Sequence, residues 1–156
     1  MIKINVTINN EKKELEVKPY EKLVDALRRY GYKGTKKGCY EGTCGACVVL
    51  LNNKPVNSCL ILAPAVENQQ ITTIEGIGTM NKPHPLQESI VEAGGVQCGY
   101  CTPGFIMSAY ALLLKNPEPT EEEIKRATDG NLCRCTGYVK KIEGVLKAVE
   151  KMRGGK

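Results

Sequence analysis

The spacing of eight cysteines limits the folds open to this chain of 156 residues more than any other feature does. Four of them stand in two short glycine-containing segments, Cys98 and Cys101 in the first and Cys133 and Cys135 in the second. A two-residue gap lets two sulfurs bind one metal centre, whereas the one-residue gap of the second pair is too short for an ordinary structural zinc half-site. We therefore expect these four thiols to converge on a cluster with more than one metal atom.

Each of these segments opens into an apolar pattern of helical period. Thr102 can cap the helix that follows the first pair, and Pro103 suits its first position, where the missing N–H costs nothing. The positive end of this helix would then face a thiolate-rich centre, which the helix dipole favours.

The other four cysteines are separated by four, two and eleven residues: Cys39, Cys44, Cys47 and Cys59. This is the spacing of plant-type 2Fe-2S ferredoxins. Gly38, Gly42 and Gly45 would relieve steric limits where backbone N–H groups turn toward sulfur. A zinc site is the first alternative, although zinc loops usually pair their ligands as two CxxC knuckles. Buried free thiols are the second, and they do not explain three cysteines within nine residues.

The first part of the chain predicts a β-grasp beginning. Residues 2–8 alternate between apolar and polar side chains, two asparagines at 9–10 can turn the chain, and the alternation resumes at 15–17. The apolar positions at 23–30 then follow helical spacing until Gly31 stops the helix. A strand pair followed by a helix is the order that a β-grasp fold requires.

Further strands should complete this first domain. The apolar run 48–51 predicts a strand, and Asn52 and Asn53 predict a turn, which would place Cys59 on the returning strand. A last strand is expected over 71–74. The domain then ends near residue 76, where a segment of glycine, asparagine and proline without periodicity begins.

The second domain should be helical, with four helices forming a small bundle that holds both metal segments at one end. Pro85 opens the first of these helices, and Thr120 with Glu123 forms a capping box for the third. The fold class is thus α+β, with a ferredoxin-like domain at 1–76, a linker at 77–83 and a helical 2Fe-2S-binding domain at 84–156. The apolar positions expected to face the helical core are Leu86, Ile90, Val91, Ala93, Phe105, Ile106, Ala109, Leu112, Leu113, Ile142, Val145, Leu146 and Val149.

Composition and charge argue against other classes of protein. The formal net charge of +5 counts every cysteine as neutral, and two oxidised two-iron clusters would reduce it to about +1. We therefore expect no nucleic-acid partner. No stretch approaches the roughly 20 apolar residues of a membrane span, and the alternation from Met1 onward is unlike a signal peptide. The predicted location is the reducing cytoplasm, where CxxC thiols serve more often as metal ligands than as disulfides.

Two single residues invite a chemical interpretation. His84 is the only histidine, and a capping or surface role is favoured over metal ligation. Glu41 lies within the first cysteine segment, where hydrogen bonding to the loop is favoured over acid–base chemistry. We predict no catalytic residue in this chain.

Four motifs together resemble the iron–sulfur subunit of the molybdenum hydroxylases, the xanthine oxidase family. The motifs are residues 38–47, 71–76, 97–104 and 133–138, and the resemblance spans residues 2–150. It implies that the first four cysteines ligate one 2Fe-2S cluster and the last four a second.

The resemblance also implies partners. Gln97 and Cys135 would contact the pterin of a molybdopterin cofactor bound by a large partner subunit, and the first cluster would lie toward FAD on a medium subunit. Because the chain ends near residue 156, these domains are expected on separate polypeptides. Two positions depart from the family pattern, Tyr40 where glycine is frequent and Lys141 where an apolar residue is common. Neither is expected to touch the ligand set.

The predicted function is therefore a relay of single electrons within a molybdenum hydroxylase. Molybdenum hydroxylases collect two electrons per turnover, whereas each 2Fe-2S centre carries one at a time, so two centres in series form a relay. Two other functions stay open, a free-standing ferredoxin-type carrier and a zinc-stabilised interaction module. A diffusible carrier has no need of a second cluster beside a glutamine at the end of a helical bundle, whereas a docking subunit does.

Overall fold

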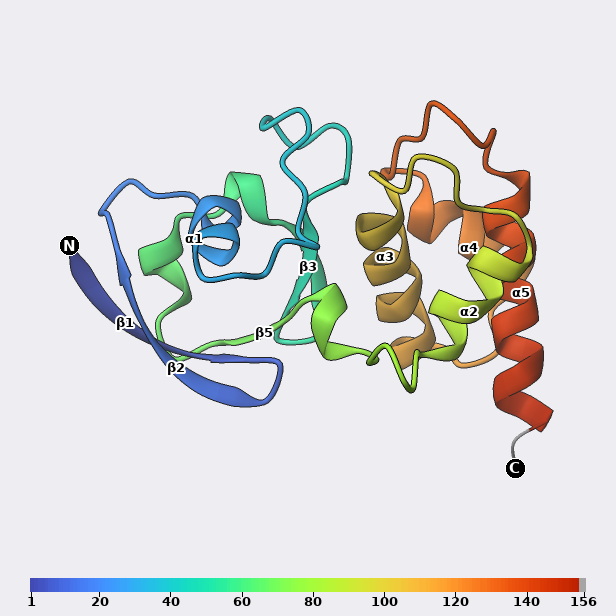
Figure 1. The fold of residues 1–156 in the computed structure, drawn as a ribbon, viewed down its shortest axis with the longest axis horizontal. Coiled ribbons are helices and arrows are strands. Elements are labelled where there is room, and N and C mark those ends of the chain that lie inside the picture. Colours follow the sequence, from blue (N-terminus) through green and yellow to red (C-terminus); the bar gives the residue numbers. More distant parts are fainter. Residues whose placement is uncertain (155–156) are drawn as a thin grey trace.

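The structure is a computed structural model that describes residues 1–154, and it places a β-sheet domain beside a helical domain (Figure 1). The sheet and α1 occupy one half of the molecule, and α2 to α5 occupy the other. The α+β fold class is confirmed. Within residues 1–154, no helix is long and apolar enough to cross a membrane.

The predicted hairpin is present. Strands β1 (Ile2–Ile8) and β2 (Glu11–Val17) pair antiparallel in the register Ile2 to Val17. Asn9 and Asn10 connect them with φ angles of 50° and 68°, a left-handed conformation that asparagine tolerates better than most residues. Alternate residues of β1 are buried, so one face of the hairpin lines the core as the sequence alternation indicates.

Three more strands complete a five-stranded sheet of order β2-β1-β5-β3-β4. β3 (Val48–Leu51) and β4 (Lys54–Asn57) are antiparallel, and β5 (Gln70–Thr72) runs parallel to β1 and antiparallel to β3. Helix α1 (Leu23–Arg29) contributes three buried residues, Leu23, Ala26 and Leu27, to the aliphatic core beneath this sheet.

Two expectations about this domain are wrong in detail. Cys59 is not on the returning strand, because β4 ends at Asn57 and the chain then forms a 3-10 turn, Ser58–Leu60. The last strand ends at Thr72 rather than at residue 74, where another 3-10 turn begins, Ile74–Gly76. Both differences arise where the chain leaves the sheet to turn, and local tertiary contacts rather than strand periodicity decide such ends.

The four helices are α2 (Pro85–Glu92), α3 (Thr102–Lys115), α4 (Glu121–Thr128) and α5 (Val139–Gly154). They share a core centred on Phe105 and Ile90. A Cβ at Gly144 of α5 would lie 2.6 Å from the Ile90 Cα, so this glycine lets α5 approach the backbone of α2. Val91 is an exception to the predicted core, since 63% of its surface is exposed.

The N-terminal caps of α2, α3 and α4 can be compared with the capping predictions. Thr120 and Glu123 form the predicted capping box of α4. His84 caps α2, because its Nδ1 accepts the Leu86 backbone N–H at 3.1 Å and Gln87 accepts the His84 N–H at 2.8 Å. The predicted cap at Thr102 is wrong: the N-cap of α3 is Cys101, and no side-chain cap bond forms there.

Helix α3 joins the two domains. Its residues Met107 and Ala111 pack against Val48 and Leu50 of β3 in a small buried cluster. A Cβ on Gly104 would lie 2.1 Å from the Gly45 carbonyl oxygen, so only glycine permits this contact between the helix start and the first cysteine segment. In Figure 1 this brings α3 next to the end of β3.

Candidate metal centres

The first site is the loop that carries Cys39, Cys44 and Cys47, closed by Cys59. Backbone N–H groups point at its sulfurs: those of Glu41, Thr43 and Cys44 lie 3.5, 3.3 and 3.4 Å from the Cys39 Sγ. The Cys39 and Ala46 N–H groups likewise lie 3.4 and 3.5 Å from the Cys44 Sγ. The loop thus presents donors to thiolates, which is what a negatively charged iron–sulfur site requires.

These donors set the electrostatics of the first site. Hydrogen bonds from the Thr43 side chain and the Glu41 N–H lower the pKa of Cys39 to about 5. Cys47 and Cys59 instead lie in the core behind the loop, and burial raises the pKa of Cys59 to about 11. The site therefore has an outer pair of polarised thiols and an inner pair shielded from water.

Glycines allow this loop to close. Gly42 and Gly45 adopt φ angles of 85° and 72°, in the region that favours glycine. A Cβ at Gly38 would lie 2.6 Å from the Cys44 Sγ, so the space it would fill belongs to the sulfur. Tyr40 takes a φ of 66° although it is not glycine.

Tyr40 is held by its side chain. Its hydroxyl donates to the Asp25 carboxylate, which raises the pKa of Tyr40 to about 12, and the ammonium groups of Lys22 and Lys37 lie 3.8 and 4.0 Å from the ring centroid. The ring also packs against the buried cluster that contains Cys47. The expectation that this departure from the family pattern does not touch the ligand set is therefore wrong.

The second site gathers four thiols from two segments of the helical domain. Cys98 precedes α3 and is exposed, whereas Cys101 is the N-cap of that helix. Cys133 and Cys135 approach from the segment that precedes α5. In Figure 1 both segments lie at the same end of the helices, which agrees with the predicted placement.

Threonine and backbone groups polarise part of the second site. The Thr136 hydroxyl lies 3.2 Å from the Cys133 Sγ and its N–H lies 3.5 Å away. Burial opposes the charged form of Cys133, but these hydrogen bonds outweigh it and lower its pKa to about 6. The Tyr100 N–H lowers the pKa of Cys98 in the same way.

The second site also contains a buried lysine. The Lys141 Nζ lies 2.6 Å from the Cys101 Sγ, and its side chain is fully buried. The expectation that Lys141 does not touch the ligand set is wrong. The sequence does contain a signal for this buried lysine, because Lys141 stands at a position where the helical pattern of α5 faces the core.

Within residues 1–154, no three His, Cys, Asp or Glu side chains are arranged to hold a single metal ion. Three pairs of thiols adjoin one another: Cys47 with Cys59, Cys98 with Cys135, and Cys101 with Cys133. Cys39 and Cys44 are linked instead by their backbone N–H groups, each of which points at the other's sulfur. A 2Fe-2S cluster binds four thiolates through two irons, so four thiols at each site fit the donor set that it needs.

The two sites are joined by hydrogen bonds between the domains. The Leu132 N–H donates to the Cys44 carbonyl at 2.9 Å, and the buried Asn131 side chain donates to the Gly45 carbonyl at 3.0 Å. The Tyr100 hydroxyl donates to the Lys37 carbonyl at 2.6 Å. Residues next to ligands of one site thus bond to residues next to ligands of the other. Sequence reasoning missed Asn131, because nothing in the pattern around it indicates its distant partner.

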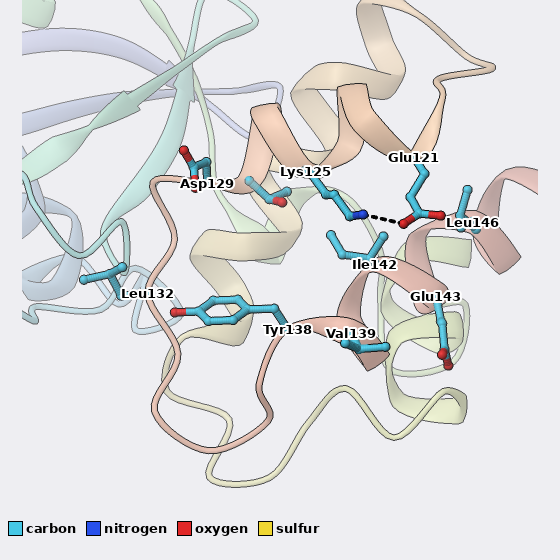
Figure 2. Close-up of a pocket in the computed structure, with 10 residues that line it drawn as sticks. Glu121, Lys125, Asp129, Leu132, Tyr138, Val139, Ile142, Glu143 and Leu146 are labelled. Atoms are coloured by element: carbon cyan, nitrogen blue, oxygen red, sulfur yellow. Dashed lines mark ion pairs between the residues drawn. The ribbon is translucent and has the colours of Figure 1, made fainter.

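The outer side of the second site is open. Gln97 and Cys135, the two residues predicted to contact a pterin, are both exposed. Next to the second cysteine segment, α4 and α5 enclose a groove of about 600 Å³, shown in Figure 2, lined on one side by Leu132, Tyr138 and Val139. These three side chains are exposed apolar surface next to the second cysteine segment.

Comparison with known proteins assigns each site to a domain family. Residues 6–73 match the 2Fe-2S iron-sulfur cluster binding domain, and residues 73–146 match a 2Fe-2S binding domain. The first match contains the first cysteine set and the second contains the other. Fold and sites together define an iron–sulfur protein with two 2Fe-2S binding domains.

Similar proteins narrow the class. The chain is 50% identical over 151 residues to the nicotinate dehydrogenase small FeS subunit of Eubacterium barkeri, covering 96% of both chains. It is 50% identical over 132 residues to xanthine dehydrogenase/oxidase of Mus musculus, covering 78% of this chain and 10% of that protein. Quinoline 2-oxidoreductase from Pseudomonas putida 86 contains a chain of TM-score 0.93 and 39% identity, with 99% and 97% of the two chains covered. The chain belongs to the iron–sulfur subunits of the molybdenum hydroxylases, the xanthine dehydrogenase family.

Proposed function

We propose that this chain relays single electrons from a molybdopterin centre on a large partner subunit, through two 2Fe-2S clusters, toward FAD or another acceptor. The observation that carries the proposal is the direct bonding of the two sites, in which Leu132 and Asn131 donate to the carbonyls of Cys44 and Gly45. Electron transfer between two bound centres needs a short, fixed separation, and these bonds hold the two segments together.

The chain contributes placement and polarity. A bound 2Fe-2S cluster supplies the capacity to hold one electron at a time. The N–H donors to Cys39 and Cys44 stabilise negative charge at the first site, while burial of Cys47 and Cys59 excludes water from its inner side. The ligand sets are Cys39, Cys44, Cys47 and Cys59 for the first site and Cys98, Cys101, Cys133 and Cys135 for the second.

The direction of the relay follows from exposure. Gln97, Cys98 and Cys135 are exposed on the outer side of the second site, which supports contact there with the pterin of the large subunit. The first site would then face a flavin subunit. The domain boundaries that we propose are 1–76 and 84–156, with a linker at 77–83; the two family matches, 6–73 and 73–146, meet at residue 73.

Two variants of the assembled complex test the relay, compared by rapid-freeze EPR after substrate is added. Cys47→Ser alters a first-site ligand, so substrate should still reduce the second cluster while transfer to the external acceptor fails. Gln97→Ala keeps all eight ligands, so both clusters should form while assembly or reduction of the second cluster weakens. In Gln97→Ala, the loss of one partly buried hydrogen bond at the pterin interface should weaken binding there by roughly 1–3 kcal/mol.

The control is Gln70→Ala, an exposed glutamine on β5, which should behave as wild type. If Cys47→Ser erases the signal of the second cluster, the division of the ligands is wrong. If Gln97→Ala assembles and transfers as wild type does, the pterin contact is wrong. A wild-type chain that purifies without partners and exchanges electrons as a diffusible protein would favour the ferredoxin-type carrier instead.

A further inference from the structure

Lys141 is the one lysine of the described residues that is fully buried. It stands in the first turn of α5, with its Nζ 2.6 Å from the Cys101 Sγ and 4.9 Å from the centroid of the Phe105 ring. Within residues 1–154, no carboxylate forms an ion pair with it. The sulfur of a candidate ligand is thus its anionic partner.

Two physical effects oppose an ammonium at this position. Removing a charge from water is costly unless the charge is paired, and the first turn of a helix carries a partial positive charge that repels a cation. The Phe105 ring offsets part of the first cost through a cation–π contact. The remaining compensation must come from negative charge beside the ammonium, where the Cys101 Sγ of the second site lies.

The neighbouring lysine, Lys140, offers a comparison within the same helical turn. Lys140 is exposed and pairs with Glu143 at 2.7 Å in the same helical turn. Both residues share the start of α5 and the same side chain, yet only Lys141 is directed at the site. Lys140 therefore serves as a matched control.

We propose that Lys141 stabilises the reduced state of the second cluster, because its positively charged ammonium lies against the Cys101 sulfur. This inference rests on the proposed function, since it assumes that the cluster is present. The step is a one-electron reduction in which no bond forms or breaks. The electron comes from the substrate-reduced centre of the large subunit and leaves toward the first site.

A redox titration of the holoprotein, followed by the separate EPR signals of the two clusters, tests the proposal. At a fixed applied potential, Lys141→Met should lower the reduced-to-oxidised ratio of the second cluster about tenfold, equivalent to about 59 mV for a one-electron couple. Lys141→Arg keeps the charge and should restore most of the ratio. Lys140→Met should change neither cluster, and no variant should shift the first.

Lys141→Gln keeps a hydrogen-bond donor without the charge, and it decides the question if the methionine variant does not assemble. An unchanged second-cluster ratio in either neutral variant overturns the proposal, as does an equal shift of both clusters. Failure of the proposed function itself would look different, because wild-type protein would then lack one or both 2Fe-2S signals.

Discussion

The sulfurs of the first cysteine site receive hydrogen bonds from backbone N–H groups of the same loop, whereas the second site also depends on a side chain from a distant helix. At the first, the donors to Cys39 come from residues two to five positions along the same loop. At the second, Cys101 receives the ammonium of Lys141, which lies 40 residues away. One site is thus built by the local path of the chain and the other by helix packing.

This difference has consequences for charge and access. Backbone donors are neutral dipoles, so the first site polarises its sulfurs without burying a net charge. The second site buries a full positive charge at Lys141 and exposes Cys98 and Cys135. The first site is therefore shielded from water on its inner side. The second site has a charged inner side and an exposed outer side, and contact with a partner requires such an exposed side.

Removal of iron should loosen the two domains unequally. Without iron, Cys101 carries a thiol whose pKa is raised by burial, so the buried Lys141 loses its anionic partner. Breaking a buried charge pair costs about 3–5 kcal/mol. Amide hydrogen exchange of the apoprotein should show greater loss of protection at the start of α5 than in β3. The Lys141→Met apoprotein should lose less protection than the wild-type apoprotein does. Equal loosening of both domains would contradict the comparison.

Gly104→Ala should disturb the first site from within the second domain. The added Cβ would lie 2.1 Å from the Gly45 carbonyl oxygen, and neither backbone can yield easily, so we expect a loss of about 3 kcal/mol in the free energy of unfolding. The urea midpoint and the EPR signal of the first cluster measure this. Gly130→Ala is the control, because a Cβ there meets no atom within 4 Å. A first cluster unchanged in Gly104→Ala would show that the domains do not depend on this contact.

Asn131→Ala should weaken the connection between the sites without adding bulk. The variant removes the donor to the Gly45 carbonyl in a buried setting, at a cost of about 1–2 kcal/mol. Thermal unfolding measures the stability, and the rate of electron transfer between the two clusters should fall as well. Asn116→Ala removes an exposed bond to Glu123 and should change little. Equal effects from both asparagines would argue against a special role for the bond between the domains.

The smallest expected effect concerns His84 in the helical domain alone. Burial lowers the pKa of His84, so stability is complete above the ordinary histidine value of about 6.5 and falls as pH decreases toward the folded-state pKa. Protonation turns Nδ1 into a donor and removes the cap on Leu86, a loss of about 1 kcal/mol. Hydrogen exchange of α2 between pH 7.5 and about pH 5.5 reports this loss.

His84→Asn keeps a capping side chain that does not titrate, and α2 should then lose this pH dependence. Tyr110, whose ring packs edge-on at 5.2 Å, is left unchanged in the variant. Since the chain has a single histidine, no other imidazole confuses the result. A pH response of α2 that persists in His84→Asn would assign it to carboxylates.

Much of the fold could be predicted because its signals are local. The alternation of β1 and β2, the asparagine turn and the capping box at Thr120 each depend on residues a few positions apart. The first cysteine loop belongs to the same category, since three of the four cysteines of its site and the glycines between them occupy one short segment. Where prediction failed, as at Cys59 and Thr102, the chain was entering or leaving an element, and competing contacts decided the boundary.

The sequence by itself determined the two sets of four cysteines, the order of strands and helices, and the family to which the chain belongs. Only the tertiary structure decided that Asn131 reaches Gly45 and that Lys141 reaches Cys101, because these contacts join residues 86 and 40 positions apart. Periodicity shows which face of a helix is buried, but it does not show what that face meets. The partner of a buried charge is therefore known only once the helices are packed.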